Sequence, residues 1–131
     1  MILEKLFYGV AYTTTLAPDL EISGVASDSR NVETGSLFVC ITGFQSDGHE
    51  YVQQALEKGA VALLVERDLG LEQQILVSDS RKAYAQVCAN WFARPADGLR
   101  MIGVTGTNGK TSTCFIMKHL LEQNGSKVGM I

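Results

Sequence analysis

The feature that most restricts the fold is a glycine-rich segment at residues 101–112, Met-Ile-Gly-Val-Thr-Gly-Thr-Asn-Gly-Lys-Thr-Ser. Mostly apolar residues precede the loop, and a helical pattern with an apolar face follows it. A strand, a loop that ends in Gly-Lys-Thr and a helix form the order typical of a phosphate-binding loop. The alternative is an ordinary glycine turn before a helix with a surface lysine, and the strand-loop-helix context argues against it.

Each residue type in this loop has a chemical reason to be there. Gly106 and Gly109 leave room for backbone N–H groups to approach phosphate oxygens, and the N-terminus of the following helix attracts anions. Lys110 supplies a positive charge for the terminal phosphates, and the Thr111 hydroxyl is a candidate magnesium ligand. The spacing departs from the common pattern, because five residues, 104–108, separate Gly103 from Gly109. We therefore expect Gly106 to turn the loop.

Composition sets limits on the class of protein. With 131 residues, 46% of them hydrophobic and 19% charged, the chain can bury a core in one domain, or in one domain plus part of another. The net charge of −3, without a basic cluster, argues against nucleic acid as a partner. No apolar run reaches the roughly 18 residues of a membrane span. Cys40, Cys88 and Cys114 are far apart and show no C-x-x-C pairing, so we expect reduced, buried, cytosolic thiols and no metal site.

Hydrophobic patterning predicts an α/β fold in which strands alternate with helices and pair largely in parallel. Residues 1–8 favour a short helix, 13–19 a loop, and Arg94 to Gly98 a break that resembles a domain boundary. In the helix that Ser78-Asp79-Ser80 caps, we expect the apolar face to consist of Tyr84, Val87, Cys88, Trp91 and Phe92. The predicted strands are 22–26, 37–41, 60–65, 75–77, 101–104 and 128–131. The predicted helices are 51–59, 80–92 and the one that follows the glycine-rich loop and stops at Asn124-Gly125.

Two domains follow from this division. Residues 1–98 should form a domain with a mixed sheet and helices, and residues 99–131 the first β-loop-α-β unit of a phosphate-loop domain. One such unit cannot cover both faces of its own sheet. We therefore expect a piece of a longer protein, and self-association of the piece.

Polar residues gather after two predicted strands. The tetrapeptide Ser-Asp-Ser-Arg occurs at 27–30 and again at 78–81, and helix capping explains only the second copy. For residues 27–30 and 43–49, ligand contact and ordinary turn hydrogen bonding remain equally open, because ligands gather at strand ends in α/β sheets. His49 and His119 are expected to be solvated.

With these residues in hand, the chain resembles the Mur ligase family of peptidoglycan synthesis. Residues 105–112 look like that family's ATP loop, including the unusual spacing. Asp28-Ser29-Arg30, residues 35–39, Gly43 and Asp47-Gly48-His49 resemble the N-terminal domain of its MurE and MurF branches. The resemblance implies that residues 1–98 are the domain that binds the UDP-muramoyl peptide and that residues 99–131 are the truncated start of the central ATP-binding domain. Asn108 and residues 125–131 look more like the MurE branch.

The resemblance implies an ATP-dependent, magnesium-requiring, cytoplasmic ligase that adds an amino acid to UDP-N-acetylmuramoyl-L-alanyl-D-glutamate through an acyl phosphate. It also implies that this piece alone is inactive, because the amine site and the acidic magnesium ligands are not in it. Phe44-Gln45-Ser46 occupies positions where MurE members often carry His-Gln-Ala. The implied contacts to the UDP-muramoyl peptide are Ser27, Ser29, Phe44, Gln45 and Ser46; those to ATP are Gly106, Thr107, Asn108, Gly109, Lys110, Thr111 and Ser112, with Thr111 on magnesium.

Two other functions were weighed. One is a stand-alone module that holds a UDP-sugar without chemistry. The other is a small-molecule kinase or nucleotide hydrolase that uses the same loop. Against this last reading, residues 1–98 are too organised to be an appendage, and no residue after the loop offers a base.

Overall fold

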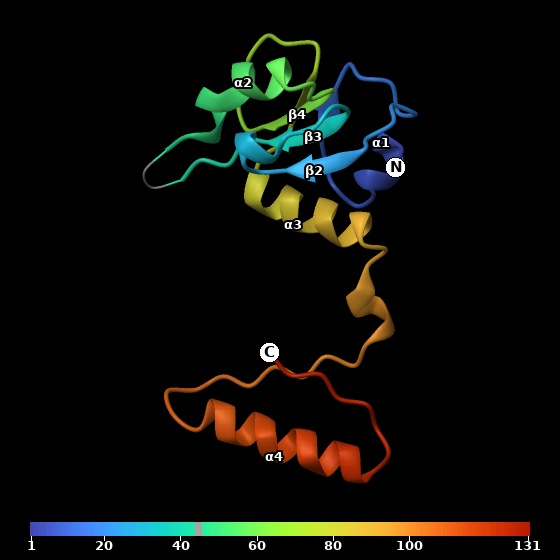
Figure 1. The fold of residues 1–131 in the computed structure, drawn as a ribbon, viewed down its shortest axis with the longest axis vertical. Helices are drawn as coiled ribbons and strands as arrows, with labels where there is room; N and C mark the ends of the chain where they lie inside the picture. Colours follow the sequence, from blue (N-terminus) through green and yellow to red (C-terminus); the bar gives the residue numbers. More distant parts are fainter. Residues whose placement is uncertain (44–45) are drawn as a thin grey trace. The chain divides into compact units, whose positions relative to one another are not determined.

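The computed structural model describes residues 1–43 and 46–131. The chain forms two compact units, Met1–Pro95 and Ala96–Ile131 (Figure 1). The division falls within the break that the sequence indicates between residues 94 and 98. The assignment of residues 1–98 and 99–131 as functional domains stays a prediction. No helix among the described residues is long and apolar enough to span a bilayer.

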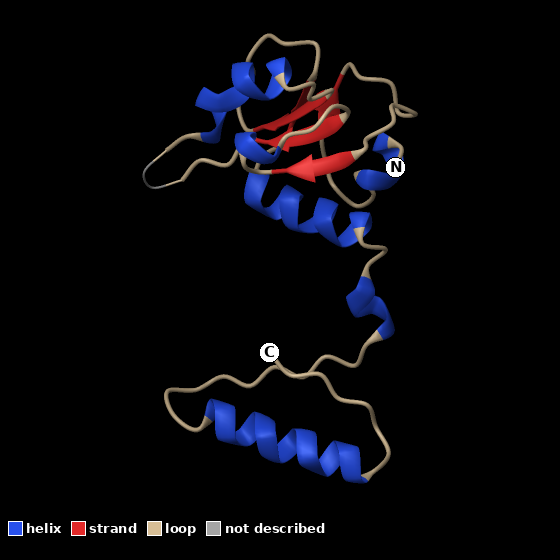
Figure 2. Cartoon of the chain, viewed as in Figure 1, coloured by secondary structure: helices blue, strands red, loops and turns tan. Residues whose placement is uncertain are grey.

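A five-stranded mixed sheet forms the centre of the first unit (Figure 2). The strand order is β1-β5-β4-β3-β2, with β2 to β5 parallel and β1 antiparallel to β5. This arrangement confirms the expected α/β fold with a mixed sheet. The strand bounds are Thr13–Thr14 (β1), Gly24–Ala26 (β2), Ser36–Val39 (β3), Ala62–Val65 (β4) and Gln74–Leu76 (β5).

Helices cover both faces of this sheet, so its central strands are buried on both sides. On β3, Leu37 and Val39 join the core beneath helices α1 (Leu3–Leu6) and α3 (Ser80–Trp91). The alternate residue Phe38 joins a second core with helix α2 (Val52–Glu57), which the 3-10 helix η2 (Gly48–Tyr51) precedes. Figure 1 shows α2 and α3 on opposite sides of the sheet. Burial on both faces explains why β3 and β4 appear in the sequence as continuous apolar runs.

Strand β1 was wrongly predicted as a loop. Its two residues pair with β5, and the Thr14 hydroxyl donates a hydrogen bond to the carbonyl oxygen of Gln74 at 2.7 Å. Two threonines carry no periodic signal, so only the pairing identifies this edge strand.

The buried face of α3 also differs from the predicted one. The Asp79 carboxylate caps the helix as expected, accepting a hydrogen bond from the Lys82 backbone N–H at 2.9 Å. Phe92, however, is exposed, and the polar Asn90 is buried in its place. The residues of α3 buried against the sheet are Ser80, Ala83, Val87 and Asn90. Of the three cysteines, all of them free, Cys40 alone is fully buried.

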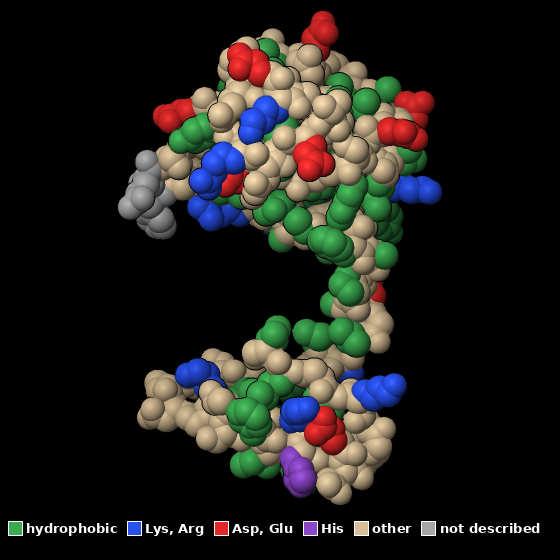
Figure 3. Space-filling view, in the orientation of Figure 1, with side chains coloured by type: hydrophobic (Ala, Val, Ile, Leu, Met, Phe, Trp, Pro, Cys, Tyr) green, Lys and Arg blue, Asp and Glu red, His purple; other side chains and the backbone are tan. Residues whose placement is uncertain are grey.

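The second unit consists of helix α4 (Lys110–Gln123) and the segments on either side of it, with the 3-10 helix η3 (Pro95–Gly98) at its start. The helix ends at Asn124 and Gly125, as the sequence predicts; Gly125 has a φ of 79°. The strands predicted at 101–104 and 128–131 are not formed. A strand exists only through hydrogen bonds to a neighbour, and neither segment has one among the described residues. Apolar side chains of this unit are accordingly exposed (Figure 3).

Candidate functional site

Polar loops follow three successive parallel strands and meet at the carboxyl edge of the sheet, where ligands bind in α/β folds. Residues 27–31 follow β2, residues 40–43 and 46–51 follow β3, and residues 66–73 follow β4. The arrowhead of β2 points to this edge in Figure 1, and Figure 3 shows Lys and Arg side chains gathered on the same side of the unit.

The loop after β2 is folded around Asp28. Its carboxylate accepts hydrogen bonds from the Arg30 side chain, with Nη2 at 2.6 Å and Nε at 3.0 Å, and from the Arg30 backbone N–H at 2.9 Å. The side-chain bonds from Arg30, followed by the backbone bond, lower the pKa of Asp28 to about 2. The carboxylate therefore stays charged and fixes the short 3-10 helix η1 (Ser29–Asn31).

Ser29 and Ser27, the two serines predicted to bind substrate, differ in environment. Ser29 is buried, and its hydroxyl donates to Oε1 of Gln54 on α2 at 2.5 Å. Its oxygen keeps lone pairs with which to accept a further hydrogen bond. Ser27 is exposed at the end of β2. Sequence patterns missed Gln54, because its position beside Ser29 arises only from the packing of α2 on η1.

His49 is buried, and the expectation of a solvated side chain is wrong. The Nδ1 atom lies 2.5 Å from Oδ1 of Asp47, and Nε2 accepts from the Glu66 backbone N–H at 3.3 Å. The other Asp47 oxygen, Oδ2, accepts from Nη1 of Arg67 at 2.8 Å. The His49 backbone N–H, then the His49 ring and Arg67, hold the pKa of Asp47 well below its usual range. The only sequence signal was an Asp-Gly-His tripeptide after a strand.

The loop between β3 and η2 is closed at its neck. Thr42 and Asp47 form an antiparallel bridge, and the Gly43 N–H donates to the Ser46 carbonyl oxygen at 2.9 Å. Gly48 lies so close to the chain before it that a Cβ would come within 2.6 Å of the Ile41 nitrogen. Ser46, a predicted substrate contact, is exposed. Phe44 and Gln45, also predicted to contact substrate, lie outside the described residues.

The N-terminus of α3 lies at the same edge but is already occupied by carboxylates. Asp79 accepts from Lys82, and Oε1 of Glu66 accepts from the Ser80 backbone N–H at 2.6 Å. Arg81, on the first turn, donates to the Thr42 carbonyl oxygen at 2.9 Å. The second Ser-Asp-Ser-Arg copy therefore caps the helix, as predicted, and leaves little capacity there for an anionic ligand.

The glycine-rich loop lies in the second unit and leads directly into α4. Gly109 is left-handed, with a φ of 75°, and no side chain caps the helix. A Cβ on Gly109 would meet nothing within 4 Å, so open space adjoins the backbone at the point where the helix starts. Nζ of Lys110 folds back to the Gly106 carbonyl oxygen at 2.7 Å.

This arrangement fits the phosphate end of a nucleotide. First-turn N–H groups, the helix dipole and the Lys110 ammonium all favour an anion, and Thr111 and Ser112 are exposed on the first turn. Thr111 is the residue that would contact magnesium. The described residues contain no group of three His, Cys, Asp or Glu side chains able to hold a metal ion, so this loop would contribute one hydroxyl rather than a full metal site.

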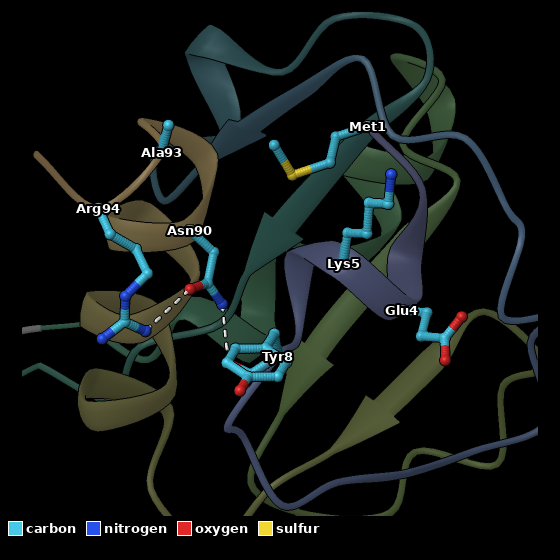
Figure 4. A pocket seen from close by; sticks show the side chains of 7 residues that line it. All are labelled: Met1, Glu4, Lys5, Tyr8, Asn90, Ala93 and Arg94. Carbon is cyan, nitrogen blue, oxygen red and sulfur yellow. Dashed lines mark hydrogen bonds between the residues drawn. The ribbon is translucent and has the colours of Figure 1, made fainter.

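A separate pocket lies between α1 and the end of α3 (Figure 4). Residues of both helices and of the turns that follow them line it, among them Lys5, Tyr8 and Arg94. Its inner wall is Asn90, whose amide donates to the carbonyl oxygens of Leu6 at 2.9 Å and Tyr8 at 2.8 Å. Among the residues that the structure describes, none of those predicted from the sequence to bind substrate or nucleotide lines this pocket.

The fold and these two sites define a class: an α/β domain with polar loops at its carboxyl edge, followed by a glycine-rich loop that leads into a helix. Comparison with known proteins gives the family. The protein-family model described as "Mur ligase family, catalytic domain" matches residues 21–94. The chain belongs to the Mur ligase family.

Relatives within the family carry a more specific name. UDP-N-acetylmuramoyl-L-alanyl-D-glutamate--2,6-diaminopimelate ligase from Syntrophomonas wolfei is 47% identical over 116 residues, covering 86% of this chain and 24% of the relative. The ligase of that name from Clostridium perfringens is 40% identical over 135 residues, covering 100% of this chain and 28% of the relative. The chain thus spans about a quarter of the length of these curated relatives.

Solved structures give the same family. A UDP-N-acetylmuramoyl-L-alanyl-D-glutamate--2,6-diaminopimelate ligase superposes with a TM-score of 0.71 at 26% identity, covering 96% of this chain and 26% of that one. The MurF ligase from Thermotoga maritima in complex with ADP superposes with a TM-score of 0.56 at 30% identity, covering 82% of this chain and 25% of that one.

Proposed function

We propose that this chain is the substrate-anchoring part and the ATP loop of a ligase that adds an amino acid to UDP-N-acetylmuramoyl-L-alanyl-D-glutamate. The observation that carries the proposal is the match along the whole chain to a ligase named for that substrate. The carboxyl-edge loops and the phosphate loop support it, because they provide a place for a nucleotide-sugar and a place for a nucleoside triphosphate.

In this proposal the carboxyl edge holds the UDP end of the substrate. Ser27 and Ser46 offer exposed hydroxyls, and the Ser29 oxygen would accept a hydrogen bond while its O–H continues to donate to Oε1 of Gln54. The cations around them, Arg30 and Arg67, lie beside carboxylates that fix their positions. Anchoring the remote nucleotide end lets its binding energy orient the reacting carboxylate elsewhere in the protein.

The second unit would hold the phosphates of ATP. The backbone of residues 106–112 would donate hydrogen bonds to phosphate oxygens, the Lys110 ammonium would neutralise charge, and Thr111 would contact magnesium. Bound ATP with magnesium supplies the phosphoryl group that activates a substrate carboxylate for attack by an amine. Lys110 must first release the Gly106 carbonyl oxygen that it contacts in this structure. We place the reaction in the cytoplasm, where ATP and UDP-linked precursors occur together.

A second candidate is the MurF reaction, which the likeness to the Thermotoga maritima MurF structure favours. A stand-alone module that binds a UDP-sugar is a third. Both would use the same carboxyl edge, so they share the anchoring role and differ from the first candidate in the reaction.

Titration calorimetry with UDP-N-acetylmuramoyl-L-alanyl-D-glutamate tests the anchoring role. We expect wild-type protein to bind, and Ser29→Ala to weaken binding about tenfold, since one hydrogen bond to a charged or polar ligand contributes about 1–2 kcal/mol. Ser23→Ala is the matched control, because the Ser23 hydroxyl bonds to the Thr34 carbonyl oxygen at the opposite end of β2. Equal binding heats for wild type and Ser29→Ala would show that Ser29 does not contact the substrate.

A further inference from the structure

His49 joins the loop after β3 to the end of β4. The exposed fraction of its side chain is 1%, and both ring nitrogens have partners. We propose that His49 is a positioning residue: it sets the conformation of the loop neck, defined as Thr42, Gly43, Ser46 and Asp47, and through the neck it sets the affinity for the nucleotide-sugar substrate. The second half of this statement rests on the proposed function.

The two contacts determine the state of the imidazole. A backbone N–H can only donate, so Nε2 must accept from Glu66 and carry no proton. The proton of the neutral ring then lies on Nδ1 and is donated to the Asp47 carboxylate. The Nδ1 side of the His49 ring therefore donates and the Nε2 side accepts, and the two sides are not interchangeable. A protonated ring would break the contact with Glu66.

Asp47 connects the His49 ring to the other residues of the loop neck. Its Oδ1 accepts from both the ring and the backbone N–H of His49, the latter at 3.0 Å, and its Oδ2 accepts from Arg67. The bridge from Asp47 to Thr42 closes the loop, and Arg81 holds the Thr42 carbonyl oxygen from α3. The neck is thus attached to β4 and to α3, which are rigid elements of the fold.

A neck held in this way reduces the conformational entropy that the loop would otherwise lose when ligand binds. Ser46, a predicted substrate contact, lies on the neck next to Asp47, and its carbonyl oxygen accepts from Gly43. A His49 that served only to fill space would be replaceable by any ring of similar size. A positioning His49 needs its two nitrogens.

Three substitutions separate these roles. His49→Phe keeps an aromatic ring and removes both contacts. His49→Asn keeps a donor near Asp47 but is too short to reach Glu66, and His49→Gln offers an acceptor toward Glu66 without the ring donor. Val87→Ala is the control for general destabilisation, because Val87 is buried in α3 on the opposite face of the sheet.

The first measurement uses the protein without ligand. Long-range proton–nitrogen NMR should show a His49 ring that is protonated on Nδ1 and unprotonated on Nε2. A ring protonated on Nε2 would overturn the proposal. Amide exchange at Glu66, Gly48 and Gly43 should be at least tenfold faster in His49→Phe than in wild type and unchanged in Val87→Ala. Exchange that matches wild type in His49→Phe would also overturn it.

The second measurement is calorimetry with UDP-N-acetylmuramoyl-L-alanyl-D-glutamate. We expect at least tenfold weaker binding in His49→Phe, smaller losses in His49→Asn and His49→Gln, and wild-type affinity in Val87→Ala. Wild-type affinity in His49→Phe would refute the link to the substrate. If the wild-type protein does not bind this compound, the proposed function fails, and the NMR and exchange results still decide whether His49 positions the neck.

Discussion

Asn90 should be one of the most stabilising polar residues of the first unit. It lies on α3 with 8% of its surface exposed, and its amide nitrogen donates to the carbonyl oxygens of Leu6 and Tyr8. These carbonyls lie at the end of the short helix α1, where helical partners are lacking. Asn90 therefore caps α1 from another helix, and the cap fixes how α1 packs on the core.

The cost of Asn90→Ala follows from these contacts. The hydrogen bond to Leu6 is buried, and leaving its acceptor unpaired costs about 1–3 kcal/mol. The bond to Tyr8 is partly accessible to water, so its loss costs about 0.5–1.5 kcal/mol. Alanine favours the helix by about 0.5 kcal/mol over asparagine. We expect the free energy of unfolding to fall by about 1–4 kcal/mol, a large share of the 5–15 kcal/mol typical of a domain.

Urea unfolding followed by tryptophan fluorescence measures this change in the intact chain. The single tryptophan, Trp91, packs against the core of the first unit, so its signal reports that unit. Gln86→Ala is the control, because it removes a donor to Oδ1 of Asn90 and leaves the bonds to α1 intact. Asn90→Asp should cost more than Asn90→Ala, since it brings a charge toward two carbonyl oxygens. A change below about 0.5 kcal/mol in Asn90→Ala would show that water replaces the amide.

Four further predictions follow from single features. Gly48→Ala should destabilise the first unit by about 1–3 kcal/mol, because its Cβ would meet the Ile41 backbone at 2.6 Å; an unchanged urea midpoint would contradict this. Ala93→Gly should stabilise it by up to about 1 kcal/mol, because Ala93 has a φ of 57° after the last turn of α3; a lower thermal midpoint would argue against strain there. ATP with magnesium should bind this chain more weakly than micromolar, since the exposed residues 105–112 offer contacts to phosphate alone; micromolar binding in calorimetry that is lost in Lys110→Ala would oppose this. Exposure of Phe115, Ile116 and Leu120, each more than half exposed, should cause self-association or fraying of α4; a monomer in sedimentation at high concentration, with strong amide protection across 110–124, would count against it.

Local signals predicted the elements whose burial is regular. The apolar runs at 37–41 and 60–65 correctly predicted strands β3 and β4, and Asp79 and Gly125 marked the start and end of helices correctly. These features depend on periodicity and capping, which act over a few residues. The loops after β2 and β3 were correctly expected at strand ends for the same reason.

Contacts between residues far apart in the sequence could not be predicted from periodicity and capping. His49 is buried because β4 brings the Glu66 N–H to its ring from 17 residues away, and Asn90 is buried because α1 ends beside it from more than 80 residues away. Neither pairing leaves a pattern along the chain. The strands expected at 101–104 and 128–131 are not formed for the related reason that their apolar patterns were visible but no neighbour within 1–43 and 46–131 pairs with them.

The two copies of Ser-Asp-Ser-Arg show what an identical sequence leaves open. The aspartates, Asp28 and Asp79, behave alike, because each caps the turn that follows it. The arginines do not. Arg30 folds back on Asp28 in its own loop, whereas Arg81 reaches across to the Thr42 carbonyl oxygen.

The second serines, Ser29 and Ser80, differ in the same way, although both are buried. The backbone N–H of Ser80 is taken by Glu66, at the start of a long helix whose cap leaves little room for a ligand. Ser29 instead begins a single 3-10 turn beside α2. Its hydroxyl donates a hydrogen bond to Gln54, and its oxygen can still accept one. Four identical residues therefore make a helix cap at one strand end and a candidate ligand contact at the other. The element that follows each copy differs: at 78–81 it is a 12-residue helix whose first turn is capped by Asp79 and Glu66, and at 27–30 it is a single 3-10 turn beside α2.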